Sequence, residues 1–242
     1  MESLGTKGRQ RILQFGPWKK VPGFFQGVTV RSEEGDSGPV YEKFAEAQRR
    51  DGFPFINRLK QVHGSLVVEV GEEVGESKVE ADGLTGSEPG VLGVISVADC
   101  VPVFILDPES RGWGLLHAGW RGVAANIMGK GLKMMEKKPG AMASAFQVYL
   151  GPSICGSCYE VGNDVANILD RITSKGVKLR DNKKYADLRS ILSIQAESFG
   201  VPRENIYTSK YCTRCNNDLF HSFRAEGKAA LGRMLAFAGM RK

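Results

Sequence analysis

The 242-residue chain is poor in histidine, with three residues in all, and it has no long apolar run. Its longest apolar stretches, such as Val91–Ala98, are less than half the ~20 residues that a membrane-spanning helix needs. The first 20 residues also contain no apolar core of a signal peptide. From these absences we expect no membrane segment and a cytoplasmic location.

Cysteine is also scarce, with five residues. In a reducing compartment, cysteines are more often metal ligands, catalytic groups or buried residues than disulfide partners. The sequence contains no internal repeat and no linker rich in proline, glycine or serine. It therefore predicts one domain over residues 1–242.

The net charge is +6, but lysine and arginine are scattered apart from a modest cluster over residues 130–138. The chain has no RNP motif, no helix-turn-helix pattern and no tight basic–aromatic stripe, which argues against a nucleic-acid partner. A mild positive field favours an anionic co-substrate such as phosphate. The sequence does not define the oligomeric state.

Short β-branched segments alternate with segments of helical periodicity, which predicts a mixed fold of helices and strands. The expected strands are Leu66–Val70, Val91–Val97, Val101–Leu106, Trp113–His117 and Phe146–Leu150. The expected helices are Gly122–Lys137, Asn163–Ser174 and Asp187–Phe199, and the last two stop shortly before Gly176 and Gly200. Such an order of elements favours a single α/β or α+β domain.

Two of the three histidines and one cysteine stand where strands begin or end. His63 precedes an expected strand, Cys100 follows one, and His117 lies where a strand passes into a helix. Two imidazoles and one thiolate form a set that zinc accepts, with the fourth position left open for water or substrate. A carboxylate usually fixes the outer nitrogen of such a histidine, and either Asp82 or Asp99 could do so.

The segment that follows His117 has features of an anion site. Gly119 and Gly122 allow close backbone approach, and the helix that follows would offer free N–H groups at its N-terminus. Arg121 adds a guanidinium fork that suits bidentate contact with phosphate. An ordinary strand-to-helix turn with a surface arginine would have the same sequence.

Two further pairs of cysteines are Cys155-x2-Cys158 and Cys212-x2-Cys215. Paired CxxC motifs are typical of structural zinc sites, although the segment between these two pairs exceeds the usual spacing. The sequence leaves open whether they bind a second metal or remain four free or partly buried thiols.

Six short motifs occur in the order QVHG, ADGLTG, SVADCVPVFILDP, HAGWRG, GPSICGSCYEVG and CTRCNNDLFHSFR. This ordered set resembles the laccase-domain family, long labelled multicopper polyphenol oxidase, over residues 57–240, with a weaker start near residue 24. Members of that family are read as zinc-dependent purine nucleoside phosphorylases that also deaminate adenosine. The resemblance implies a single-domain α+β fold, an α/β/β/α sandwich similar to the catalytic domain of cytotoxic necrotizing factor.

The resemblance also implies roles for residues. It places the metal ligands on His63, Cys100 and His117, with Cys100 and His117 also catalytic together with Arg31. By the same resemblance, Arg224 matches an arginine of a family motif near the C-terminus. We expect Arg224, together with Arg121 and Gly122, to bind substrate or phosphate. The chain departs from the family pattern at Glu33 and Glu34, which replace glycines, and at His221, next to a motif that lacks its second arginine.

The expected reaction converts a purine nucleoside (adenosine, inosine, guanosine or methylthioadenosine) and phosphate into base and sugar 1-phosphate, with Zn2+ as cofactor and copper as a weaker option. Three rivals stay open. A copper-dependent phenol oxidase needs on the order of ten histidines for its copper cluster, far more than this chain has. A metal-free hydrolase would use Cys100 with His117 as base. A non-enzyme would hold only structural zinc and bind a partner.

Overall fold

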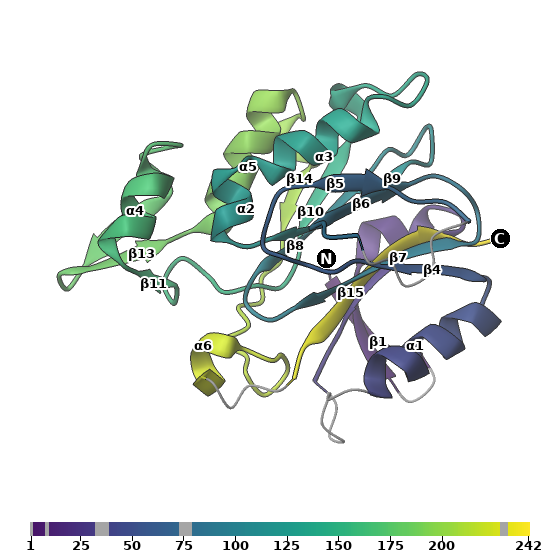
Figure 1. Cartoon of the computed structure of the whole chain (residues 1–242), viewed down its shortest axis with the longest axis horizontal. Coiled ribbons are helices and arrows are strands. Elements are labelled where there is room, and N and C mark those ends of the chain that lie inside the picture. Colours follow the sequence, from purple (N-terminus) through teal and green to yellow (C-terminus); the bar gives the residue numbers. More distant parts are fainter. Residues whose placement is uncertain (1, 8–9, 32–38, 73–78, 228–231) are drawn as a thin grey trace.

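Two six-stranded sheets form the centre of the molecule, and helices cover both of their outer faces (Figure 1). The computed structural model describes residues 2–7, 10–31, 39–72, 79–227 and 232–242. The first sheet has the order β1 (Glu2–Lys7), β2 (Gln10–Phe15), β3 (Phe24–Thr29), β15 (Met234–Met240), β7 (Val91–Val97) and β4 (Phe55–Arg58). The second has the order β14 (Ile206–Thr208), β10 (Gln147–Leu150), β8 (Val101–Leu106), β9 (Trp113–Ala118), β6 (Gly83–Gly86) and β5 (Val67–Glu69).

A smaller sheet and six α-helices complete the described fold. The small sheet has the order β11 (Glu160–Val161), β13 (Lys183–Ala186) and β12 (Val177–Arg180), and it projects from one end of the molecule beside α4 (Figure 1). The helices are α1 (Pro39–Arg50), α2 (Trp120–Ala124), α3 (Ile127–Met135), α4 (Asn163–Asp170), α5 (Leu188–Phe199) and α6 (Phe223–Glu226). Short 3-10 turns cover Gly16–Lys20, Ala143–Ala145 and Arg203–Asn205.

Three apolar clusters define the layers. The first lies between the two sheets and includes Ile95 and Phe104. A second joins α3 and α5 to the outer face of the second sheet, and a third joins α1 to the outer face of the first sheet. In the third cluster Phe44 of α1 packs on Phe237 of β15, with 5.0 Å between the ring centroids. The layer order is therefore helix, sheet, sheet, helix, and the predicted α+β sandwich is confirmed.

The central strands match the sequence prediction closely because nearly all of their residues are apolar. β7 and β8 have the predicted bounds, and β9 extends one residue past the expected end, to Ala118. Strands buried on both faces have continuous apolar sequences, which are easy to recognise. Within the described residues, no helix is both long and apolar enough to cross a bilayer.

The expected helix Gly122–Lys137 is wrong as a single element, because the structure divides it into α2 and α3. Asn126 adopts a left-handed conformation with φ of 55°, which ends the first helix. Its side chain then accepts a hydrogen bond from the backbone N–H of Gly129 at 3.1 Å and caps the second helix. The expected helix Asn163–Ser174 is likewise shorter, since α4 ends at Asp170.

The two sheets meet closely around the indole of Trp113, which is fully buried. A Cβ atom on Gly93 would lie 2.9 Å from two Trp113 ring carbons, and one on Gly86 would lie 2.5 Å from another. Glycine at these positions therefore lets the ring occupy the space between β6, β7 and β9. This contact fixes the separation of the sheets at the end of β9 where the strand begins.

We expect Gly93→Ala to lower the free energy of unfolding by about 1–3 kcal/mol, because the added methyl overpacks the Trp113 contact. Gly5→Ala is the matched control, since no atom lies within 4 Å of its added Cβ, and we expect a change within ~0.5 kcal/mol. Urea unfolding measures both values. Equal stability of the two variants would contradict the close-packed contact.

Candidate metal centre

His63, Cys100 and His117 converge on one point although they are far apart in the sequence. His117 lies near the end of β9, and Cys100 directly precedes β8, which pairs with β9 in antiparallel register. His63 comes from the loop between β4 and β5. One ligand atom of each side chain lies within 4.8 Å of the others. This spacing allows all three to reach one ion, because zinc bonds to nitrogen and sulfur are ~2.0–2.3 Å long.

Gly119 makes room for this convergence. A Cβ atom at this position would lie 3.1 Å from the Cys100 sulfur and 3.2 Å from the Cδ2 carbon of His63. His117 and Cys100 are buried and half-buried, whereas His63 is exposed. The centre therefore has a protein-enclosed side and a solvent-facing side.

The buried carboxylate of Asp82 organises two of the three ligands. Its Oδ1 lies 2.8 Å from Nδ1 of His117 and accepts the backbone N–H of His63 at 3.0 Å. Its Oδ2 accepts the backbone N–H groups of Val62 and Gly64 at 3.2 and 2.6 Å. With Nδ1 of His117 held by a carboxylate, Nε2 is the nitrogen left to face an ion. Asp82, and not Asp99, is thus the carboxylate behind His117.

The electrostatics of the centre favour a thiolate. Burial alone would raise the pKa of Cys100, but hydrogen bonds and charges from His117 and His63 outweigh it and lower that pKa to about 6. Burial opposes the charged form of His117, yet its contacts with Asp82 and Cys100 raise its pKa to about 9. An anionic sulfur is the form that binds a metal cation.

Asp99 has a different task. It is buried, adopts a left-handed backbone conformation with φ of 77°, and immediately precedes Cys100. Its Oδ1 accepts the hydroxyl of Thr213 at 2.6 Å, and its Oδ2 accepts the backbone N–H of Arg224 at 2.8 Å. Asp99 therefore connects the cysteine ligand to the loop over residues 212–215 and to α6.

A pocket of ≈ 520 Å³ lies between α2, β11, α4 and α6. Its lining includes Trp120, Tyr159 and Arg224, and the guanidinium of Arg224 lies 4.9 Å from the centroid of the Tyr159 ring. Burial raises the pKa of Tyr159. The pocket adjoins the metal centre through Arg224, whose backbone N–H donates to Asp99, the residue before Cys100. The sequence prediction included Arg224 but missed Tyr159 and Trp120, although both stand inside the recognised motifs.

The other predicted residues have defined contacts. Arg121 is exposed and lies over the Trp120 ring at 4.4 Å from its centroid. Gly122 is buried, and a Cβ atom there would lie 2.8 Å from the carbonyl oxygen of Gly64. In the structure Gly122 therefore packs closely against the backbone of Gly64. The helix after His117 has only five residues, so the helix dipole expected there is weak.

Arg31 forms an ion pair with Glu226 of α6, the short helix that also carries Arg224. The predicted catalytic residue thus lies next to the helix that borders the pocket. Its catalytic role and the phosphate roles of Arg121, Gly122 and Arg224 stay predictions. Glu33 and Glu34, which depart from the family pattern, lie outside the described residues.

Fold and site together define a two-sheet α+β protein with a candidate metal centre of two histidines and one cysteine. A profile of the multi-copper polyphenol oxidoreductase laccase family matches residues 24–241, so the chain belongs to this family, as its motifs predicted. It is 34% identical over 203 residues to purine nucleoside phosphorylase YlmD of Geobacillus stearothermophilus, covering 76% of this chain and 71% of the relative.

A solved structure and a second named relative are also similar to this chain. The crystal structure of YlmD from Geobacillus stearothermophilus superposes with a TM-score of 0.85, at 28% identity and over 100% of both chains. A relative named adenosine deaminase RL5, from an unknown prokaryotic organism, is 29% identical over 69% of each chain. The relatives' names therefore include both a phosphorylase and a deaminase.

We expect Asp82→Asn to weaken metal binding at this centre by roughly 10- to 100-fold, because an amide cannot accept all four hydrogen bonds of the carboxylate. Asp107→Asn is the matched control: this buried carboxylate accepts hydrogen bonds from Glu109 and Ser110 in a separate turn. Competition with a chelating dye measures the metal affinity. The ion that belongs to this centre is the one that the Cys100→Ser variant no longer binds. Unchanged affinity in folded Asp82→Asn would contradict the role of Asp82.

Proposed function

We propose that the chain is a zinc-dependent purine nucleoside phosphorylase, with adenosine deamination as a second activity of the same site. The observation that supports it is the convergence of His63, Cys100 and His117 within 4.8 Å, beside an open pocket with aromatic and cationic walls. The names of the relatives add the substrate class. Adenosine, inosine, guanosine and methylthioadenosine are the candidate substrates.

The three donors fit zinc better than the metals that prefer oxygen. Two imidazoles and one thiolate are borderline-soft ligands, and a set of three leaves one position for water or substrate. When bound, the ion would supply Lewis-acid stabilisation of charge that develops on the substrate. His63, Cys100 and His117 would hold it, with Asp82 fixing the orientation of His117.

The pocket supplies the remaining binding groups. We assign phosphate to the guanidinium of Arg224, whose Nη1 already donates to the carbonyl of Glu160 at 2.8 Å and is thereby held at the rim. Arg121, over the Trp120 ring, adds positive charge on the α2 side. Tyr159 and Trp120 offer apolar faces for the purine and the ribose. In this arrangement phosphate attacks C1′ as the bond to the base breaks.

Deamination would use the same nucleoside with water in place of phosphate: water attacks C6 of the base, and the amino group leaves as ammonia. The relative named adenosine deaminase RL5 favours this second activity. The two reactions have different products, adenine and inosine. Their ratio as a function of phosphate concentration separates them.

The rival mechanisms make different demands on the same residues. A hydrolase that uses Cys100 and His117 does not require a third metal-binding side chain. The ring centroid of His63 nevertheless lies 4.8 Å from that of His117, which favours the metal mechanism. A copper cluster needs more imidazoles than this chain has, and the third histidine, His221, packs against Glu226 and Met234 instead. Loss of activity with a chelator and its return with zinc would support the metal mechanism over the thiol one.

Pure protein should release adenine from adenosine only when phosphate is present, with ribose 1-phosphate as the second product. We expect Cys100→Ser to reduce this rate by on the order of 100-fold or more, because the variant lacks the thiolate that binds the metal. Chromatography of the products measures both reactions. A folded His63→Ala, Cys100→Ala double variant that released adenine at the parent rate would rule out the metal mechanism.

Arg224→Ala should raise KM for phosphate by roughly 10- to 100-fold, because a charge-assisted hydrogen bond contributes about 1.5–3 kcal/mol. Arg224→Lys should recover part of the loss, since it keeps the charge without the fork. Arg49→Ala, in the last turn of α1 on the opposite side of the sandwich, is the control. An unchanged KM in Arg224→Ala would move the phosphate site elsewhere, with Arg121 as the next candidate.

A further inference from the structure

A second set of metal-binding side chains lies outside the centre described above. The sulfur atoms of Cys155, Cys158, Cys212 and Cys215 all lie within 4.8 Å of one another, and those of Cys158 and Cys215 are 3.4 Å apart. The corners of a tetrathiolate zinc site are roughly 3.8 Å apart, given Zn–S bonds of ~2.3 Å. Two separate disulfides would require close approach only within each pair of sulfur atoms. Here all four sulfur atoms lie close to one another, as ligands of a single ion would.

The backbone around these cysteines is already shaped for ligation. In the first pair, the backbone N–H groups of Cys158 and Tyr159 donate to the carbonyl of Cys155 at 2.9 and 3.1 Å, which closes a tight turn. In the second pair, the N–H of Asn216 donates to the carbonyl of Cys212 at 2.9 Å. The N–H of Cys155 also donates to the sulfur of Cys212 at 3.3 Å, a contact that stabilises a thiolate.

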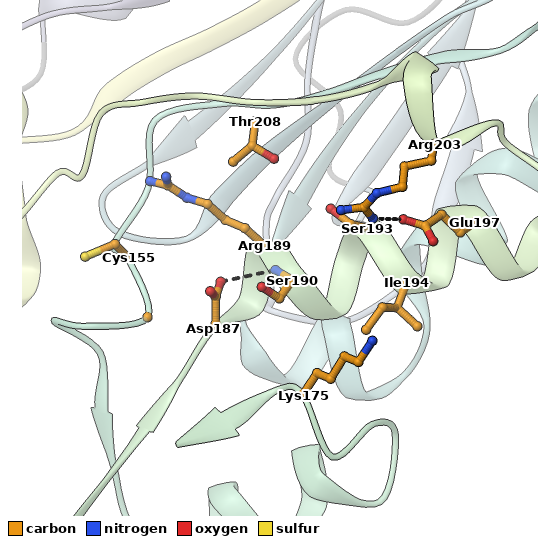
Figure 2. A pocket seen from close by; sticks show the side chains of 11 residues that line it. Cys155, Lys175, Asp187, Arg189, Ser190, Ser193, Ile194, Glu197, Arg203 and Thr208 are labelled. Atoms are coloured by element: carbon orange, nitrogen blue, oxygen red, sulfur yellow. Dashed lines mark hydrogen bonds and ion pairs between the residues drawn. The ribbon is translucent and has the colours of Figure 1, made fainter. Parts of the chain in front are cut away.

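The two cysteine turns are joined by a buried arginine. Arg189 reaches from α5 toward the loop that carries Cys155 (Figure 2). Its Nε donates to the hydroxyl of Ser153 at 2.7 Å, and its Nη2 donates to the carbonyl of Tyr211 at 2.5 Å. These partners stand just before the two CxxC motifs. Zinc with four thiolates has a net charge of −2, and a buried cation next to it offsets part of that charge.

We propose that this group, the four-cysteine site, binds a structural zinc ion that fastens the turn at Cys155–Cys158 to the turn at Cys212–Cys215. Four thiolates complete a tetrahedral shell and leave no position for substrate, which is the pattern of a structural site. The free thiols of a metal-free four-cysteine site would leave the two turns held only by hydrogen bonds.

The four-cysteine site also borders the proposed substrate pocket. Cys158 lines that pocket, and Arg214 donates to the carbonyl of Cys158 at 3.1 Å across the two turns. Thr213, between the second pair of cysteines, donates to Asp99, the residue before Cys100. The ion would therefore position one wall of the pocket and the loop behind Cys100, without contacting substrate.

Metal content tests the four-cysteine site without assaying the reaction. We expect about two zinc ions per parent chain, and about one in each of Cys100→Ser, Cys158→Ser and Cys215→Ser. Ser157→Ala, in the same turn as Cys158, is the matched control and should keep both ions. Cys215→His should restore the second ion, because imidazole replaces one thiolate and Cys215 is exposed.

Cobalt substitution gives an independent spectrum. Cys100→Ser loaded with Co2+ should show the strong sulfur-to-cobalt charge-transfer bands of a tetrathiolate site, and Cys158→Ser should keep only the weaker band of the single Cys100 thiolate. One metal per parent chain, lost in Cys100→Ser and kept in Cys158→Ser, would overturn the proposal. So would thiol titration that finds Cys155, Cys158, Cys212 and Cys215 oxidised to disulfides in protein purified without added oxidant.

A kinetic measurement tests the positioning role, and only this part rests on the proposed function. Cys215→Ser should lower kcat/KM for adenosine phosphorolysis while the ion at His63, Cys100 and His117 stays bound, and Cys215→His should recover it. If the parent releases no adenine but holds two ions, the proposed function fails and the four-cysteine site stands. Loss of the second ion without any change in kcat/KM would overturn the positioning role.

Discussion

The buried carboxylate of Asp82 is the contact on which the candidate metal centre depends. An unpaired carboxylate in the interior is costly, and Asp82 offsets the cost with His117 and three consecutive backbone N–H groups at Val62, His63 and Gly64. One side chain thus orients a ligand on β9 and shapes the loop that presents another. Because both ligands are held by the same group, neither can shift without disturbing the other.

Two of the six described non-glycine residues with positive φ lie at the same place. His63 and Asp99 have φ of 57° and 77°, a region that side chains other than glycine seldom adopt. Each is held there by partners: the N–H of His63 by Asp82, and the carboxylate of Asp99 by Thr213 and Arg224. Strained backbone of this kind persists where surrounding contacts enforce it. Here it orients the imidazole of His63 and the thiol of Cys100, the residue after Asp99, toward each other.

The strands that the sequence predicts best are those whose burial is nearly complete. β7 and β8 are apolar except for Ser96 and match the predicted bounds to the residue, whereas β1, with its polar sequence ESLGTK, forms a strand only because it pairs with β2. The candidate metal ligands are predicted from residue type and motif, and the structure brings them together. The choice between Asp82 and Asp99 behind His117 is not predictable in this way, because it depends on which strands are neighbours. Tyr159 was missed for the same reason, since only the fold brings it into one pocket with Trp120 and Arg224.

Asp99 also explains why the two cysteine-containing centres are not independent of each other. Its carboxylate contacts Thr213, which stands between Cys212 and Cys215, and its backbone leads directly into Cys100. A change in the turn of the four-cysteine site would therefore reach the thiol of the candidate metal centre through one hydrogen bond of 2.6 Å and one peptide bond. Such a link couples the positions of the two loops and does not alter which side chains can bind the first ion. A structural ion at the four-cysteine site would therefore affect the geometry of the pocket and leave the ligands of the first centre unchanged.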